Sequence, residues 1–311
     1  MSVDIIIPVR NGAEYIGECL DSVLNQTAIS LVSRIFVVND GSEDNTVEIV
    51  EKFTRQDRRV ELHSTGPKGL SAARNYGIAL STSENIAFID SDDLWISDKL
   101  ETHFIHLTKH AGCMFSFTLA SEFHTGSNVN RSQGFNSIEP TFASILLQNF
   151  RIFGSGSSVF VSRPLAVLKG GFDEGMKYGE DWDFWLKLAQ SQLPCQLDQY
   201  STLIRIHPLS MQRTKRIGDE RFLNSSIHLY EWTKYPQIFQ DPRFRDVALS
   251  ILWADVRKNF GVGSLLSKDF CNYLFTNYGS VMMKIGLRKN RLFNSMILLQ
   301  RISQVVRGLG R

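Results

Sequence analysis

Short β-branched segments alternate with stretches of helical spacing over the first hundred residues, and this alternation constrains the fold more than any other feature. The β-branched segments lie at residues 3–9, 34–39, 60–63 and 85–90, and the helical stretches at about 12–26, 43–56 and 70–82. Such alternation pairs strands in parallel through right-handed crossovers, with helices on both faces of the sheet. We therefore predict an α/β fold with an open, mixed or mostly parallel sheet flanked by helices.

The ends of these elements are also predictable. Asn11 or Gly12 is expected to begin the first helix, and Ser42 to cap the second. After about residue 112 the alternation becomes irregular. The pattern there predicts strands at 113–119, 157–162 and 196–206, helices at 141–150 and from Glu180 onward, and a surface loop at 121–137. We predict three regions: an α/β half at 1–111, a second half at 112–211 and a helical C-terminal extension at 212–311.

Composition and charge exclude several classes of protein. Hydrophobic residues make up 43% and charged residues 21% of the 311 residues, which is typical of a globular protein. Seven basic residues and no acidic residue follow Asp269. Because the net charge of the whole chain is only +2, the part before this tail is slightly acidic. A nucleic-acid-binding protein would need a basic body, so we expect no nucleic-acid partner.

The cysteines and the N-terminus indicate the cellular compartment. Cys19, Cys113, Cys195 and Cys271 are far apart in the sequence and form no C-x-x-C pair. We expect small buried apolar groups in a reducing compartment, without a disulfide framework or a zinc site. The N-terminus lacks the features of an export signal, and no run reaches the ~18 apolar residues of a membrane span. These features predict a cytoplasmic protein that is soluble or peripheral on a membrane.

Polar or glycine-containing segments follow each predicted strand of the first half. These segments are residues 8–12, 39–42, 64–69 and 90–93. In open α/β sheets, ligands bind beyond the carboxyl ends of the strands. The sequence therefore predicts a ligand site at this edge of the sheet.

The most acidic of these segments is Asp90-Ser91-Asp92-Asp93. Carboxylates this close together repel one another unless a cation or a proton lies among them. A hard divalent cation with oxygen ligands relieves the repulsion and can bridge to a diphosphate. The alternative is a solvated acidic turn, because Asp and Ser are common turn residues.

Asp40 and Arg74 are candidates for nucleotide binding. Asp40 follows a strand, where acidic residues of other α/β proteins accept hydrogen bonds from a ribose or a base. The alternative is an ordinary turn. Arg74 lies one turn inside a predicted helix, whose N-terminus favours anions, and its guanidinium can bind a phosphate through two hydrogen bonds. The alternative is a solvent-exposed helix arginine.

A second acidic centre begins the helix at Glu180. Proton removal from a hydroxyl requires a carboxylate that is not shared with a metal. Asp181 is the first candidate for this general base and Glu180 the second, although acidic residues also stabilise a helix N-terminus without any catalytic role. His207 ends the last predicted strand and is a candidate metal ligand, with a structural histidine as the alternative.

Several common catalytic motifs do not occur. The sequence contains no G-x-x-x-x-G-K-[ST] phosphate loop, no G-x-G-x-x-G fingerprint and no G-x-S-x-G elbow. Kinases, ATPases, dinucleotide-dependent dehydrogenases and serine hydrolases therefore lose their usual support.

Five segments, taken in order, resemble the family 2 glycosyltransferases of the GT-A fold. They are residues 3–12, 37–42, 69–75, 89–93 and 179–182. The resemblance covers about residues 3–210 and implies an inverting glycosyltransferase. Residues 1–111 would bind the nucleotide sugar, and residues 112–211 would bind the acceptor and carry the base. Residues 212–311 match no feature of the family.

The resemblance also implies roles for individual residues. It assigns to the donor a set that comprises Pro8, Val9, Arg10, Asn11, Asp40, Arg74, Asp90 and Ser91. Asp92 matches the metal-contacting residue of the D-x-D element, with Mn²⁺ or Mg²⁺ as the ion, and His207 is a looser match for a second ligand. Asp181 matches the catalytic base, and Glu180 is its alternative.

The implied substrates are a nucleotide-diphosphate sugar, by family habit a UDP-sugar, and a glycan or lipid-linked acceptor in cell-surface polysaccharide synthesis. The basic, apolar tail at 281–311 predicts a helix on an anionic membrane surface, while packing on the catalytic domain or at a homodimer interface explains it equally. Two other functions stay open. A sugar nucleotidyltransferase is expected to have a glycine-rich N-terminal loop that this chain lacks, and the other alternative is a non-catalytic nucleotide-sugar-binding or assembly protein.

Overall fold

The chain divides into two compact units. The computed structural model describes residues 1–126, 131–176, 178–208, 223–248, 250–251 and 283. Unit 1 contains residues 1–142 and 150–214, and unit 2 contains residues 143–149 and 215–311. Both predicted halves of the α/β region therefore lie mainly in unit 1.

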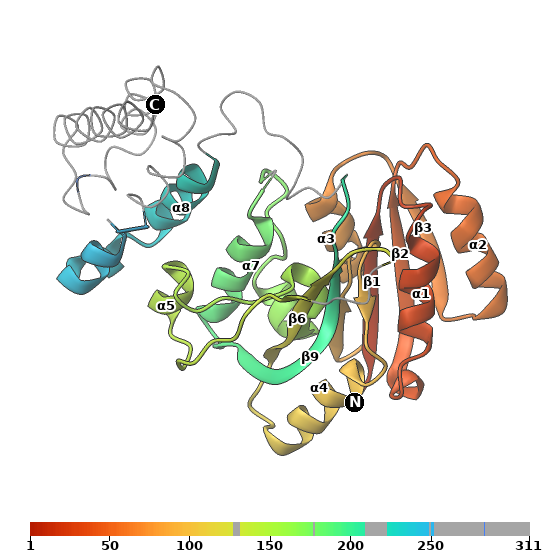
Figure 1. The fold of residues 1–311 in the computed structure, drawn as a ribbon, viewed down its shortest axis with the longest axis horizontal. Helices are drawn as coiled ribbons and strands as arrows, with labels where there is room; N and C mark the ends of the chain where they lie inside the picture. Colours follow the sequence, from red (N-terminus) through yellow and green to blue (C-terminus); the bar gives the residue numbers. More distant parts are fainter. Residues whose placement is uncertain (127–130, 177, 209–222, 249, 252–282, 284–311) are drawn as a thin grey trace, which may run out of the picture. The chain divides into compact units, whose positions relative to one another are not determined.

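Unit 1 is built on one sheet (Figure 1). Within the described residues its strand order is β3–β2–β1–β4–β8–β6–β9–β5, with β7 paired to β6. The strands are β1 (Val3–Val9), β2 (Val32–Asp40), β3 (Val60–Thr65), β4 (Asn85–Phe88), β5 (Leu94–Trp95), β6 (Phe115–Phe123), β7 (Arg131–Ser132), β8 (Val159–Ser162) and β9 (Cys195–Arg205). The helices of unit 1 are α1 (Ile16–Leu24), η1 (Ile29–Leu31), α2 (Thr46–Gln56), α3 (Leu70–Leu80), α4 (Lys99–Lys109), η2 (Ser155–Ser158), α6 (Arg163–Leu168) and α7 (Glu180–Ala189). Helix α5 (Phe142–Leu146) lies almost entirely in unit 2.

The sheet is mixed. Strands β3, β2, β1 and β4 run parallel, whereas β8 is antiparallel to both β4 and β6. Strand β9 returns to a parallel pairing with β6. The predicted mixed α/β fold with helices on both faces is thus confirmed, and the parallel part is the half that the sequence predicted from strand–helix alternation.

Strand β1 is buried on both faces, which explains why its residues from Ile5 to Val9 are all apolar. Ile5 and Ile7 point into a core that they share with α1, α2 and α4. Ile6 points to the opposite face and lies under α3, where a Cβ on Gly77 would come within 2.5 Å of Ile6 Cγ2. Only glycine lets α3 approach the sheet this closely, and Figure 1 shows α1 and α2 on the opposite side of these strands from α3.

Aromatic side chains form the core on the α3 side. The Phe172 ring contacts Phe88 of β4 edge-on at 5.4 Å and Phe184 of α7 at 4.4 Å between ring centroids. Trp185 stacks on Phe115 of β6 at 5.6 Å. These contacts fix α7, and with it the Glu180–Asp181 pair at its first turn, against the sheet.

Two helices begin later than predicted. Helix α1 begins at Ile16, after a turn at residues 13–15. The backbone N–H groups of Gly12 and Ala13 bind Thr46 Oγ1 and Asp44 Oδ2. Helix α2 begins at Thr46, and Ser42 does not cap it. The sequence could not show these bonds because their partners lie on different loops.

The structure also differs from the prediction at residues 121–137 and at helix α4. The segment at 121–137 is not only a surface loop, because β6 continues to Phe123 and β7 pairs with it. Helix α4 was not predicted: its buried face contains Lys99 and His103, so its apolar spacing is interrupted. Lys99 Nζ contacts His103 Nε2, Thr118 Oγ1 and the Ser158 carbonyl, and burial lowers its pKa well below the ordinary value.

The expectation that the cysteines form no disulfide is wrong. Cys113 and Cys195 are disulfide-bonded. They are 82 residues apart in the sequence, but the parallel pairing of β6 with β9 aligns Ser116 with Cys195 and brings the two thiols together. Cys19 is a free, buried residue, as predicted.

Unit 2 includes α8 (Leu223–Lys234) and η4 (Pro236–Gln240). Trp232 is fully buried there, donates a hydrogen bond from Nε1 to the Leu146 carbonyl, and contacts the rings of His228 and Phe239. The predicted helical extension is helical in these segments. Apart from Met283, the basic tail at 281–311 lies outside the described residues.

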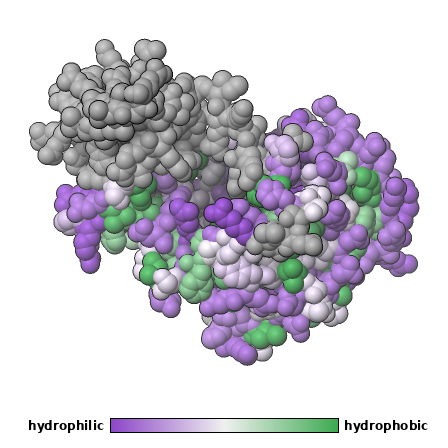
Figure 2. All heavy atoms as spheres, viewed as in Figure 1, coloured by the Kyte–Doolittle hydropathy of each residue, from purple (hydrophilic) through white to green (hydrophobic). Residues whose placement is uncertain are grey.

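None of the helices among the described residues has the length and apolar character that a membrane span requires. Polar residues dominate the face of unit 1 seen in Figure 2, and apolar residues are scattered over it in small groups.

Candidate active site

The carboxyl ends of β1 and β2 are joined by hydrogen bonds between the loops that follow them. The Asn11 N–H donates to Ser42 Oγ at 2.9 Å, and the Glu43 N–H donates to Asn11 Oδ1 at 2.8 Å. Asn11 has a φ of 52°, a left-handed conformation that asparagine tolerates. Asn11 thus shapes this edge of the sheet.

The other predicted donor residues of these loops lie at the same edge. Pro8 and Val9 are buried at the end of β1, and Arg10 is exposed just beyond it. Ser91 lies against Gly12, where an added Cβ would come within 3.3 Å of Ser91 Oγ. The structure therefore brings the β1 loop and the acidic segment after β4 together.

Asp40 is buried and holds the loop that precedes α3. Its Oδ1 accepts a hydrogen bond from the Lys68 N–H at 2.7 Å, and its Oδ2 accepts one from the Gly69 N–H at 2.9 Å. Gly69 has a φ of 99°, which favours glycine. These bonds give Asp40 a structural function, and its contact with a ribose or base stays a prediction.

Arg74 connects the two acidic centres. Its Nη2 donates to Asp90 Oδ1 at 2.7 Å and its Nη1 to Glu180 Oε1 at 3.0 Å. The side chain is buried, so the alternative of a solvent-exposed helix arginine is wrong. Burial disfavours the charged guanidinium, but the carboxylates of Asp90 and Glu180 outweigh burial and raise the Arg74 pKa. Phosphate binding by Arg74 stays a prediction.

The short helix η2 completes the wall around Arg74. A Cβ on Gly156 would come within 3.1 Å of Arg74 Nη2, so a larger residue would press on the guanidinium. Ser157 Oγ accepts a hydrogen bond from the Asp90 N–H at 3.0 Å and donates to Asp93 Oδ2 at 2.5 Å. Sequence reasoning missed this helix, although the run Gly154-Ser155-Gly156-Ser157-Ser158 was a visible signal of close backbone approach.

Asp92 and His207 meet across the site. Asp92 Oδ2 and His207 Nε2 are 2.9 Å apart, and the ring of Tyr15 contacts the imidazole at 4.8 Å between centroids. Burial and the charge of Asp90 raise the Asp92 pKa, while the bond to His207 acts in the opposite direction. The two residues predicted as metal ligands are therefore neighbours, although 115 positions separate them in the sequence.

Arg205 is a site residue that the sequence analysis did not assign. It is buried between the rings of Tyr15 and Phe123, with its Cζ atom 4.7 Å and 4.6 Å from their centroids. Its Nε donates to the Asp92 carbonyl at 2.8 Å, and its backbone N–H donates to Asp93 Oδ1 at 3.0 Å. Burial and the neighbouring carboxylates Asp92 and Asp90 raise the Asp93 pKa well above its ordinary value. Arg205 fixes the acidic turn from the β9 side.

The two candidate bases have different environments. Glu180 is buried against Arg74, and burial together with the charge of Asp181 raises its pKa to about 7. Asp181 is less buried and accepts a hydrogen bond from Ser155 Oγ at 2.8 Å. Because Glu180 is committed to Arg74, Asp181 is the carboxylate better placed to meet a substrate hydroxyl.

The turn before α7 is attached to α3 by Asn75. Its Nδ2 donates to the Phe172 carbonyl at 2.9 Å, and its Oδ1 accepts from the Phe172 N–H at 2.8 Å. A Cβ on Gly171 would come within 2.3 Å of Asn75 Oδ1. Asn75 lies in the segment 69–75, but the sequence analysis assigned it no function. By fixing the turn at Phe172, it helps to hold α7, which begins with Glu180 and Asp181, beside Arg74.

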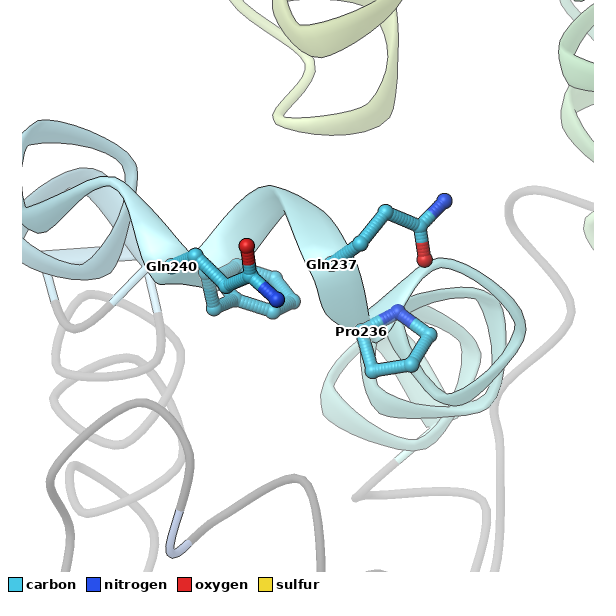
Figure 3. A pocket seen from close by; sticks show the side chains of 4 residues that line it. Pro236, Gln237 and Gln240 are labelled. Carbon is cyan, nitrogen blue, oxygen red and sulfur yellow. The ribbon is translucent and has the colours of Figure 1, made fainter.

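A hollow of about 290 Å³ lies in unit 2 (Figure 3). It is lined by Pro236, Gln237, Phe239 and Gln240, and none of these side chains titrates. This hollow has no chemistry in common with the acidic site of unit 1.

Comparison with known proteins agrees with this geometry. The sequence profile of glycosyl transferase family 2 matches residues 4–162, which include β1 to β8 and the acidic segment after β4. The chain belongs to glycosyltransferase family 2.

Two proteins with similar sequences come from bacteria. Chondroitin synthase of Pasteurella multocida is 32% identical over 197 residues, which cover 60% of this chain and 19% of that protein. Glycosyltransferase GlyA of Streptococcus pneumoniae is 30% identical over 190 residues, which cover 58% of this chain and 27% of that protein. The chain thus aligns with only about a fifth to a quarter of the length of these relatives.

Solved structures show the same fold. Residues 1–349 of TarS from S. aureus, in complex with UDP-GlcNAc, superpose with a TM-score of 0.69 at 19% identity. The superposition covers 94% of this chain and 84% of that one. The complex of the same TarS segment with UDP gives a TM-score of 0.66. The GT-A fold predicted from the ordered motifs is therefore confirmed.

The donor atoms of this family 2 glycosyltransferase suit a hard divalent cation. Asp92 offers a carboxylate oxygen and His207 an imidazole nitrogen, and these two donor atoms are 2.9 Å apart. Mg²⁺ and Mn²⁺ need few protein ligands when water and phosphate oxygens supply the others. The residues present therefore fit such an ion.

Proposed function

We propose that this chain transfers a sugar from a nucleotide-diphosphate sugar to a hydroxyl of a glycan or lipid-linked acceptor during polysaccharide synthesis, with inversion at the anomeric carbon. Family membership supports the transferase activity. The observation that carries the proposal is the Arg74 bridge, because it joins the Asp90 segment to the Glu180–Asp181 pair in one site. Transfer of a sugar requires the donor-binding residues and the base to lie in one site, and this bridge supports that arrangement.

Asp181 is proposed as the general base. It would take the proton from the acceptor hydroxyl while the oxygen attacks the anomeric carbon and the bond to the diphosphate breaks on the opposite side. The hydrogen bond from Ser155 to Asp181 Oδ2 orients the carboxylate. Arg74 keeps Glu180 close without exposing it, so that Glu180 supports the geometry of Asp181.

Asp92 and His207 are proposed to hold Mn²⁺ or Mg²⁺. When bound, such an ion would neutralise the negative charge that develops on the departing diphosphate. Arg205 and Ser157 position the acidic turn through the Asp92 carbonyl and the Asp90 N–H. A UDP-sugar is the proposed donor, because the structural neighbour TarS was crystallised with UDP and with UDP-GlcNAc.

Membrane association through the basic tail at 281–311 is part of the proposal, because seven basic residues without acidic ones would attract anionic lipid and bring the enzyme to a lipid-linked acceptor. Flotation with anionic and with neutral vesicles tests this part. We expect the full chain, but not a chain ending at residue 280, to float with anionic vesicles.

Donor cleavage tests the proposed function. The full chain is incubated with a panel of UDP-sugars and Mn²⁺, with and without EDTA, and the products are separated by chromatography. We expect slow, EDTA-sensitive release of the nucleoside diphosphate from one donor, faster when the acceptor is present. Release of pyrophosphate from a nucleoside triphosphate and a sugar phosphate would instead indicate a nucleotidyltransferase, and binding of donors without any cleavage would indicate a non-catalytic protein.

A further inference from the structure

A second cluster of metal-binding side chains lies at the other end of the sheet. His106 of α4, Cys113 in the turn before β6 and Cys195 at the start of β9 each offer one donor atom, and these atoms lie within 4.8 Å of one another. The pairing of β6 with β9 brings the two cysteines together, and α4 packs over both strands with His106 in its last turn. Three separate segments thus converge on one point.

The imidazole of His106 has a buried nitrogen atom that is able to bind a ligand. Its Nε2 atom is buried and has no hydrogen-bond partner, although such a nitrogen normally finds one. Burial and the neighbouring His110 lower the His106 pKa. A neutral imidazole with a free nitrogen is the form that binds a metal.

The donor set selects the metal by its chemistry. Two thiolates and an imidazole suit zinc, whereas magnesium and calcium prefer oxygen. Zinc bonds of ~2.3 Å to sulfur and ~2.0 Å to nitrogen place the donors of a tetrahedral site roughly 3.5 Å apart. The three donor atoms already lie within 4.8 Å of one another, so after reduction the two sulfurs need only separate by a side-chain rotation to hold an ion.

A fourth ligand lies beside the cluster. His110 follows His106 by four residues, so both rings project from the same side of the chain, and their centroids are 4.4 Å apart. His110 is exposed and therefore able to turn. The spacing His106-x₃-His110-x₂-Cys113 is also typical of zinc ligands drawn from a helix and an adjacent turn.

We propose that His106, Cys113 and Cys195, in the reduced protein, bind one structural zinc ion, with His110 as the fourth ligand. The disulfide between Cys113 and Cys195 is the alternative, oxidised state of the same pair. A phosphine reductant converts that state into two thiols: the phosphine takes the oxygen of one water molecule, and the two hydrogens of that water complete the thiols. Zinc then displaces both thiol protons.

This zinc site is separate from the proposed reaction. Cys195 begins β9 and Arg205 ends it, and eleven residues of strand span roughly 35 Å. Zinc would join α4 to β6 and β9 at the far end of the sheet. Whether or not zinc binds there, the proposed glycosyl transfer is unaffected.

The test measures metal content in the full chain. Protein is reduced with a phosphine, equilibrated with one equivalent of zinc, freed of loose metal with a weak chelator and analysed by mass spectrometry of the metal. We expect one zinc per chain, and none at this site when the disulfide is left oxidised. With cobalt in place of zinc, we expect thiolate-to-cobalt charge-transfer bands, which Asp92 and His207 cannot produce.

Variants assign the ligands. His106→Ala and the double variant Cys113→Ser, Cys195→Ser are expected to weaken zinc binding by more than about 100-fold, and His110→Ala by about 10-fold. Replacement of the exposed His124 by Ala should leave the zinc content unchanged. The proposal is overturned if reduced wild-type protein retains no zinc, or if its cobalt form lacks the charge-transfer bands. Neither result depends on whether a variant folds.

Discussion

Arg74 is buried with its two terminal nitrogens on two different carboxylates, so its loss would leave Asp90 and Glu180 without a cation. Removing one partner from a buried ion pair typically costs 3–5 kcal/mol, far more than the pair itself contributes. We therefore expect Arg74→Met to lower the free energy of unfolding by about 4 kcal/mol in urea titrations. The control is Arg55→Ala, because the Arg55–Glu51 pair is exposed and should contribute less than about 1 kcal/mol. Equal losses in the two variants would contradict the buried bridge.

Glu180 should make stability depend on pH. Its pKa is raised from 4.5 to about 7 in the folded protein, so the folded state binds more protons than the unfolded state between these values. The stability that neutral Glu180 contributes is therefore present below pH 4.5 and is lost as pH rises through 7. We expect the free energy of unfolding of Glu180→Gln, relative to wild type, to increase from pH 5 to pH 8 by up to about 3 kcal/mol. A difference that stays constant with pH would show that Glu180 is ionised throughout.

Asp181 should affect transfer but not donor binding. Asn keeps the shape of the side chain and an oxygen for Ser155, but it cannot accept the proton of the acceptor. We expect Asp181→Asn to reduce the rate of sugar transfer by 10²–10⁴-fold, the usual contribution of a general base, with an unchanged dissociation constant for the donor. The exposed Asp198, replaced by Asn, serves as the control. Normal turnover of the Asp181 variant with the true acceptor would remove Asp181 from this role.

At the scale of elements, the site depends on how closely α3 lies on β1, because Arg74 projects from this helix. Gly77→Ala would place a Cβ within 2.5 Å of Ile6 Cγ2 and push the helix away from the sheet. We expect a loss of about 1–3 kcal/mol in the free energy of unfolding, typical of overpacking. Gly66→Ala is the matched control, because its Cβ would meet no atom within 4 Å.

The effect of Gly77→Ala should be partly relieved by a smaller neighbour. In the double variant Gly77→Ala, Ile6→Ala, the loss of unfolding free energy should be smaller than the sum of the losses in the two single variants. The reason is that the added methyl group fills space that the shorter side chain vacates. Strict additivity would mean that the helix does not touch Ile6.

At the scale of the whole molecule, the two compact units should unfold separately. Trp232 is fully buried in unit 2 and bonded to the Leu146 carbonyl, so Trp232→Ala should cost that unit about 3–5 kcal/mol. Calorimetry of the full chain should show one transition shifted to lower temperature and the other unchanged. The exposed Tyr230, replaced by Ala, is the control. A shift of both transitions together would contradict two independent units.

Much of the fold and part of the site followed from local pattern. Strand β1 lies at Val3–Val9, where the β-branched residues predicted it, and the order of the motifs identified the family. Polar segments after the parallel strands lie at one edge of the sheet, as the sequence predicted. Helix α4 was missed because its buried face includes Lys99 and His103, whose partners lie on β6 and in η2. A pattern of apolar residues cannot show a polar residue that is buried by a distant partner.

From the sequence alone, the candidate site residues could be named: carboxylates after β4, a second carboxylate pair at α7, and Arg74 and His207. How these residues connect became visible only in the folded chain. Arg74 binds both acidic centres, Arg205 holds the acidic turn from β9, and Cys113 meets Cys195. Each of these contacts joins residues at least sixteen positions apart, and most join residues more than eighty apart. Their proximity arises from strand pairing and helix packing, which local residue patterns do not encode.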